Sequence, residues 1–99
     1  MRDVQLLVLT ALAAKPMHGH RIRSDVEDLS GRSVGPGTLY GAISRLEEDG
    51  LVRPLPPRDR RKPYEITDAG RRHLAGEMAA SRNLVQIAEE RLGGIAWTD

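Results

Sequence analysis

The sequence predicts a mainly helical fold with one small β-hairpin and a long final helix that belongs to the same compact unit. Three observations predict it. Apolar residues recur at helical spacing in three separate segments before Gly50. Two short alternating segments then flank a tip rich in proline and arginine, which is typical of a hairpin with a long loop. The last segment carries apolar residues at coiled-coil spacing.

Composition limits the class of protein. The chain has 99 residues, enough for one small domain, and no cysteine, which excludes disulfides and thiolate metal sites. It contains no Phe, so the core is expected to be aliphatic. The N-terminal segment lacks the features of a signal peptide, and no apolar run approaches the roughly 20 residues that span a bilayer. We therefore expect a cytoplasmic protein.

The first three helices have clear ends in the sequence. The first is expected to end at Lys15–Pro16, because a proline disfavours helical geometry in the residue before it. The second begins near His18 and closes at Ser30–Gly31, where glycine can adopt a left-handed cap. The third runs from Pro36, suited to the first helical position, to Asp49, and Gly50 stops it. Its buried face is predicted to consist of Leu39, Ala42, Ile43 and Leu46.

Two strands are predicted at residues 51–53 and 64–66, joined by a mobile basic loop that makes a wing. The prolines of this segment, expected to deter further strand pairing at the tip and its edges, are Pro54, Pro56, Pro57 and Pro63.

The last helix is expected to begin with Thr67 as N-cap and to break at Gly93–Gly94, after about Leu92. Its coiled-coil seam, which Leu84 and Ile87 widen, is Leu74, Met78, Ser81, Val85, Ala88 and Leu92. The element order is that of a winged helix-turn-helix with an appended helix. The predicted organisation is a DNA-binding domain at 1–66, a dimerisation helix at 67–92 and a tail at 93–99.

In a helix-turn-helix the second helix of the pair enters the DNA major groove, and here that is the helix from Pro36 to Asp49. Its exposed residues are small or can form hydrogen bonds. Thr38 and Tyr40 can contact phosphates, and Gly41 allows close approach of the backbone. Ser44 and Arg45 are the better candidates to read base edges, since arginine can bond guanine twice. The alternative is that this helix face is simply solvated, with one exposed tyrosine and no role in DNA binding.

A basic cluster follows this helix although the formal net charge is only +1. Arg58, Arg60, Arg61 and Lys62 fall at the predicted hairpin tip, where they would lie over phosphates or enter the minor groove. A loop that merely solubilises the protein is the alternative.

Other functional classes find little support. His18, His20 and His73 lack the spacing of a metal site, and no nucleophile setting or phosphate-binding glycine loop is present. We predict no enzyme activity, metal or cofactor. Two alternatives to a DNA-binding function remain: a winged-helix module that binds protein, and an enzyme or ligand carrier.

Four successive motifs carry a family resemblance. They are His18-Gly19-His20-Arg21-Ile22, Pro36-Gly37-Thr38-Leu39-Tyr40, Arg45-Leu46-Glu47-Glu48-Asp49-Gly50-Leu51, and Lys62-Pro63-Tyr64-Glu65-Ile66-Thr67-Asp68-Ala69-Gly70. Together they resemble PadR-type transcriptional regulators, in the short subfamily with a single C-terminal helix. The resemblance implies a homodimer, often a repressor, that binds a pseudo-palindromic DNA operator. Some members release DNA when a small aromatic or drug-like molecule binds.

By motif, the resemblance places Thr38, Tyr40 and Arg45 on the DNA-facing helix, with Lys62 and Tyr64 at the wing. It also implies that the C-terminal helix pairs with the first helix region of the partner. The resulting interface prediction is Val4, Leu7, Val8, Leu74, Met78, Ser81, Val85, Ala88 and Leu92.

Trp97 is either an effector-site aromatic or, as we favour, a tail residue packed on the dimer surface. The chain departs from the family pattern at Gly35, Pro36, Gly41 and His20, which leaves the operator sequence open.

Overall fold

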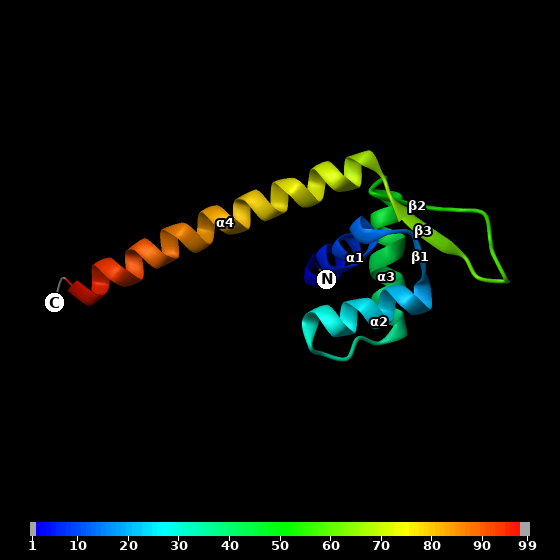
Figure 1. The fold of residues 1–99 in the computed structure, drawn as a ribbon, viewed down its shortest axis with the longest axis horizontal. Helices are drawn as coiled ribbons and strands as arrows, with labels where there is room; N and C mark the ends of the chain where they lie inside the picture. The colour runs from blue at the N-terminus through cyan, green and yellow to red at the C-terminus, as the bar shows by residue number, and fades with distance from the viewer. Residues whose placement is uncertain (1, 98–99) are drawn as a thin grey trace.

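The computed structural model describes the backbone of residues 2–97 and the side chains of residues 3–93. Three helices pack around one core beside a small antiparallel sheet, and a long fourth helix leaves this body (Figure 1). The predicted fold class is therefore confirmed. In chain order the elements are α1 (Arg2–Ala14), β1 (Met17–His18), α2 (Gly19–Ser30), α3 (Pro36–Glu48), β2 (Val52–Pro54), β3 (Pro63–Ile66) and α4 (Asp68–Trp97).

The helix ends follow the local sequence signals. Gly31 adopts φ 69° after α2, and its N–H donates to Glu27 O at 2.8 Å, which closes the last turn. Pro36 opens α3, and Gly50 adopts φ 74° just after it. Thr67 Oγ1 accepts the Gly70 N–H at 3.0 Å and so caps α4. The same hydroxyl donates to Gly50 O at 2.7 Å, which ties α4 to the end of α3.

The core is aliphatic apart from Tyr64, close to what the lack of Phe predicts, and it draws on all three short helices and the sheet. Val4 and Val8 are buried in this core, so the expectation that they contact a partner chain is wrong for these two residues. Leu7 is only half-buried. Helical periodicity marks an apolar face, but it does not say whether that face meets the same chain or another one. The fully buried side chains with the largest volumes are Leu9, Leu12, Ile22, Leu39, Ile43 and Leu46.

The sheet has a third strand that periodicity did not predict. Its order is β1-β3-β2, and both pairings are antiparallel. Strand β1 pairs Met17 with Tyr64 and His18 with Pro63. Two residues are too few to show an alternating pattern, so only the tertiary structure reveals them. Pro54 is the last residue of β2 and Pro63 the first of β3, so both lie at strand ends, where a missing N–H is tolerated and regular pairing stops.

The wing ends in a defined turn where the sequence predicted a mobile loop. Arg58 and Arg61 exchange two backbone hydrogen bonds of 2.8 Å, with Asp59 and Arg60 between them. Both central residues have positive φ, 50° and 64°, as in a two-residue hairpin turn of type I′. Arg60 is exposed at this turn.

Helix α4 gives the molecule its elongated shape, with extents of 62 × 28 × 20 Å. It begins beside the sheet and extends away from the body, in the direction opposite to the wing (Figure 1). Gly70 permits the close start, because a Cβ there would lie 2.7 Å from Ile66 Cγ1 and would collide with the Leu51 carbonyl. The helix continues to Trp97, so the predicted break at Gly93–Gly94 is wrong. Glycine costs a helix only about 1 kcal/mol, and no proline follows to enforce a stop.

Within the part of the chain that the structure describes, no helix combines the length and apolar character needed to cross a membrane.

Candidate nucleic-acid interface

Helix α3 presents a polar face to solvent because its apolar residues are fixed in the core. Leu39, Ala42, Ile43 and Leu46 are all buried, as predicted. The other side of the helix carries Thr38, Tyr40, Gly41, Ser44 and Arg45, all of them exposed. The first turn holds no acidic residue, so the positive end of the helix dipole is not neutralised there. This end of α3 is suited to an anionic partner.

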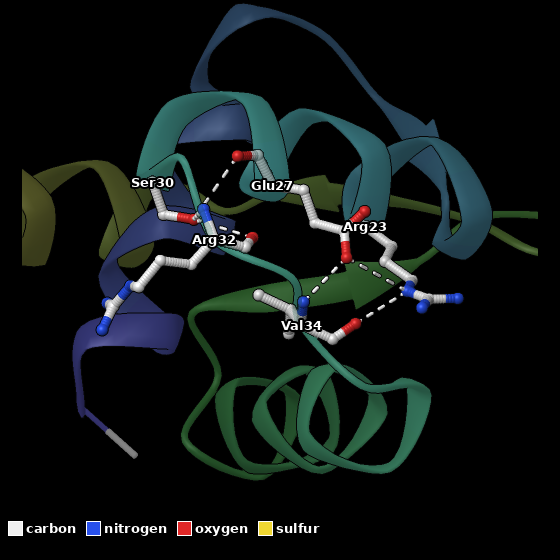
Figure 2. Close-up of polar contacts among 5 residues, drawn as sticks. All are labelled: Arg23, Glu27, Ser30, Arg32 and Val34. Carbon is white, nitrogen blue, oxygen red and sulfur yellow. Dashed lines mark hydrogen bonds and ion pairs between the residues drawn. The ribbon is translucent and has the colours of Figure 1, made fainter.

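The turn before α3 is held by Glu27 and Arg23 of α2 (Figure 2). Glu27 Oε2 accepts the Val34 N–H at 2.7 Å and lies 3.8 Å from Arg23 Nε. Arg23 Nε in turn donates to Val34 O at 2.7 Å. One residue thus has both backbone groups bound by the preceding helix. Sequence reasoning missed this pair because the contact depends on how the turn folds back onto α2.

Ser30 completes the same turn from the end of α2. Its hydroxyl oxygen accepts the Arg32 N–H at 3.2 Å, so the chain leaving the helix is bonded to the last residue of the helix (Figure 2). Val34 then enters the core. These contacts fix where α3 starts relative to α2, which is what a helix-turn-helix requires.

Tyr40 connects α3 to the start of α2 and to the wing. Its side chain is 46% exposed, yet it lies so close to Gly19 that a Cβ there would be 2.7 Å from Tyr40 Cζ. Next to this contact is a cleft of about 400 Å³, which we call the α2–wing cleft. The residues that line it are His18, Gly19, His20, Tyr40, Arg60, Arg61, Lys62 and Tyr64. The structure therefore brings Tyr40 together with three of the four predicted basic wing residues.

Tyr64 has a different place from the one predicted for it. Only 8% of it is exposed, because it lies on β3 within the core, where it pairs with Met17 and Pro54. Lys62 Nζ lies 5.6 Å from the centre of its ring, a cation–π contact. Tyr64 thus supports the wing from inside, while Lys62, Arg58, Arg60 and Arg61 are exposed.

Two of the predicted DNA-facing residues lie outside the α2–wing cleft in distinct settings. Thr38 borders a separate hollow next to Ser33 and Arg32. Arg45 Nε lies 3.4 Å from Oδ2 of Asp49, the C-cap residue of α3, and the arginine side chain is 64% exposed. The carboxylate orients the guanidinium and balances part of its charge. An exposed pair of this kind contributes little to stability, so Arg45 can exchange Asp49 for another acceptor.

His18 and Gly19 were not predicted as site residues. His18 is the N-cap of α2, and its Nδ1 accepts the Arg21 N–H at 3.3 Å. Burial, followed by the charges of Arg61, His20 and Arg21, lowers the pKa of His18 below 6.5. Histidine is not among the common N-cap residues, so the sequence offers only its position before α2 as a signal.

The outer part of α4 exposes a row of large apolar side chains. Leu84 and Leu92 are 67% and 68% exposed. Met78, Val85 and Ile87 belong to the same exposed set. Leu74, by contrast, is half-buried against the core. Ser81 and Ala88 are exposed, and the side chain of Trp97 lies outside the described residues.

The fold and this surface define a winged helix-turn-helix protein: an α2–turn–α3 unit, a basic hairpin wing and an additional long helix. Comparison with known proteins gives the family. The model of the transcriptional regulator PadR-like family matches residues 8–76. The chain belongs to this family, and it is a DNA-binding transcriptional regulator rather than an enzyme.

Individual proteins are similar to the chain in sequence or in fold. The chain is 37% identical to the transcriptional regulator Rv3488 of Mycobacterium tuberculosis, over 96% of this chain and 88% of that protein. It is 51% identical over 75 residues to an uncharacterized 37.1 kDa protein in transposon TN4556 of Streptomyces fradiae, and that match spans only 22% of the transposon protein. A PadR family transcription regulator from Clostridium difficile has a similar fold. Its TM-score is 0.78 at 24% identity, over 90% of this chain and 97% of that one.

Proposed function

We propose that this protein is a repressor that binds a pseudo-palindromic DNA operator as a homodimer. The observation that carries the proposal is the meeting of α3 and the wing at one cleft, where Tyr40 lies beside Arg60, Arg61 and Lys62. A hydrogen-bonding helix face next to a group of cations suits a duplex, which offers base edges in its groove and phosphates on either side.

In this proposal α3 enters the major groove, with Ser44 and Arg45 reading base edges. Gly41 supports it, since nothing lies within 4 Å of the position where its Cβ would be and the backbone can approach a base pair closely. Thr38 and Tyr40 are placed on phosphates at the N-terminal end. The Arg45–Asp49 pair supports a reading role, because Asp49 orients the guanidinium before DNA arrives.

The wing is proposed to lie over the backbone or to enter the minor groove. Arg60 supports this because it holds positive φ at the tip, where glycine would fit with less strain. Backbone strain at an exposed residue is often retained for a functional side chain. None of the described carboxylates is paired with Arg58, Arg60 or Lys62, so their charges are available to phosphates.

The second subunit is proposed to cover the exposed apolar face of α4. Met78, Val85 and Leu92 repeat every seven residues on that face, which matches the seam of a coiled coil. A two-fold dimer would place two α3 helices in successive major grooves, about 34 Å apart. An operator with matching half-sites follows from that symmetry. We also place the protein in the cytoplasm, with the DNA it would bind.

Release of DNA by a small aromatic or drug-like effector stays a prediction from the family resemblance. The Trp97 backbone belongs to α4, which would put this residue near the proposed dimer contact. We retain the interpretation that it packs on the dimer surface.

Selection of bound sequences from a random DNA pool tests the proposal. We expect a two-fold motif, and a reporter under that motif should be repressed. Arg45→Ala should relax base preference at one position per half-site, by about 1–3 kcal/mol. Arg60→Gln should weaken binding to all sequences and reduce the salt dependence of log Kd by about 0.9 for each phosphate that the wing no longer neutralises.

Arg82→Gln is the matched control, because it removes the same charge from an exposed residue of α4. If Arg82→Gln and Arg60→Gln have equal effects, the wing assignment is wrong. If the pool yields no enriched sequence while the dimer captures a protein ligand, the winged-helix protein-binding module is the correct class.

A further inference from the structure

His18 joins the α2–turn–α3 unit to the wing through both of its ring nitrogens. On one side, Nδ1 accepts the Arg21 N–H at 3.3 Å and caps α2. On the other side, Nε2 lies 3.1 Å from Nη1 of Arg61 on the wing. The imidazole thus stands between the first turn of one helix and the basic hairpin tip.

The neutral His18 ring cannot accept hydrogen bonds from both Arg21 and Arg61. A ring nitrogen that accepts a hydrogen bond carries no proton, so in the neutral imidazole the proton lies on Nε2. A guanidinium can only donate. His18 Nε2–H and Arg61 Nη1–H therefore face each other as two donors without an acceptor.

The other protonation states do not remove this mismatch. If the proton moves to Nδ1, the ring can accept from Arg61, but it no longer caps α2. If both nitrogens are protonated, the ring accepts nothing. In every state one contact needs an acceptor from outside the chain.

The surroundings favour an anion as that acceptor. His20, Arg60, Lys62 and the Tyr40 hydroxyl line the same α2–wing cleft, and no carboxylate is among its lining residues. The charged groups that act on the His18 pKa are Arg61, His20 and Arg21. The carboxylate of the wing turn, Asp59, lines a separate pocket that His18 and Arg61 also border. Burial and these charges keep the pKa of His18 low, so the ring is neutral near pH 7 and the cap is intact.

We propose that the α2–wing cleft binds one phosphodiester of the DNA backbone, whose anionic oxygen accepts hydrogen bonds from His18 Nε2–H and Arg61 Nη1–H. This rests on the proposed DNA-binding function and assigns His18 a contact that the sequence did not predict. The phosphate supplies the missing acceptor and leaves the helix cap undisturbed. Wing and α2 are then held on the same phosphate, which fixes the wing relative to α3.

Two substitutions separate the cap from the phosphate contact. His18→Asn keeps an oxygen near the position of Nδ1 for the cap, but it has no donor that reaches Arg61. His18→Gln places an amide N–H near the position of Nε2, but it weakens the cap. We expect His18→Asn to keep the melting temperature and to bind DNA about tenfold more weakly. His18→Gln should recover most of that affinity. His73→Asn on α4 is the matched control and should bind like the wild type.

Single methylphosphonate substitutions in the selected DNA site locate the contact. One position in each half-site should weaken the wild type and have no further effect on His18→Asn, because that variant already lacks the hydrogen bond. If His18→Asn binds DNA like the wild type, or if every methylphosphonate has the same effect on both proteins, the proposal is wrong.

A titration without DNA distinguishes this proposal from the broader function. The imidazole ¹H–¹⁵N signals of His18 should report the Nε2–H tautomer and shift as inorganic phosphate replaces chloride at constant ionic strength. Arg61→Gln should abolish the shift. If the shift occurs and no DNA is bound, the anion site stands and the proposed function fails. If DNA is bound and neither His18 nor its variants respond, the site fails and the function stands.

Discussion

The phenol ring of Tyr40 on α3 occupies the space that a side chain at Gly19, the first residue of α2, would need. A Cβ at position 19 would lie 2.6 Å from Tyr40 Cε1 and 2.7 Å from Cζ. Helices α2 and α3 are therefore in contact where the backbone of Gly19 meets the half-exposed ring of Tyr40. This contact also forms one wall of the α2–wing cleft.

Gly19→Ala tests that relationship. The added methyl group must displace Tyr40, so we expect a loss of about 1–3 kcal/mol in the free energy of unfolding and weaker DNA binding. In a Tyr40→Ala background the same substitution should cost little stability, because the clash is gone. Urea denaturation of the four proteins gives the coupling energy, and additive effects would contradict the packing described here.

The second prediction concerns the turn before α3. Glu27→Ala removes the acceptor of the Val34 N–H and the partner of Arg23, and we expect a loss of about 1–3 kcal/mol in the free energy of unfolding. Glu27→Gln keeps an acceptor without the charge and should lose less. Glu47→Ala, at an exposed position of α3, is the control. Equal stabilities for Glu27→Ala and Glu47→Ala would show that the turn does not depend on Glu27.

At the wing tip, we expect Arg60 to lower the stability of the fold and to strengthen DNA binding. Arg60→Gly relieves a positive φ of 64°, so it should stabilise the fold by a few tenths to about 1 kcal/mol. The same change removes a cation and should weaken DNA binding. Arg58→Gly, at a residue without positive φ, should weaken binding and bring no stability gain. Thermal melts and fluorescence anisotropy measure the two effects. An Arg60→Gly protein that is less stable would contradict the strained geometry of the turn.

Stability should depend on pH through His18. Burial, then Arg61, His20 and Arg21, lowers its pKa in the folded state, so below about pH 6.5 the unfolded chain binds the proton more readily. The free energy of unfolding should therefore fall as the pH drops from about 6.5 through the folded-state pKa. His18→Asn has no such group and should lose less stability between pH 7.5 and 5.5 in urea denaturation. Identical slopes for the two proteins would exclude His18 as the cause.

The exposed face of α4 supplies the last prediction. Val85→Asp puts a charge in the proposed seam and should shift sedimentation from dimer to monomer or unfolded chain. Arg82→Asp, which introduces the same carboxylate beside the seam, should have a smaller effect. A wild type that sediments as a monomer at micromolar concentration would rule out the dimer.

Much of the fold follows from local residue chemistry. Gly31, Pro36, Gly50 and Thr67 mark helix ends through backbone geometry and hydrogen bonds within a few residues, so reading them needs no tertiary information. The buried face of α3 follows equally from its spacing. The end of α4 was missed because Gly93 and Gly94 only weaken a helix, whereas a proline would stop it.

The candidate site depended more on the tertiary structure. The sequence by itself determined the four helices and the two hairpin strands, the basic tip of the wing and the exposed polar residues of α3, because each is a local pattern of residue types. Only the tertiary structure placed Tyr40 against Gly19, buried Tyr64, closed Glu27 on Val34 and brought Arg61 to His18. Those relationships join residues from different elements. Their geometry depends on how helices and strands pack, and the spacing of residues along the chain does not predict it.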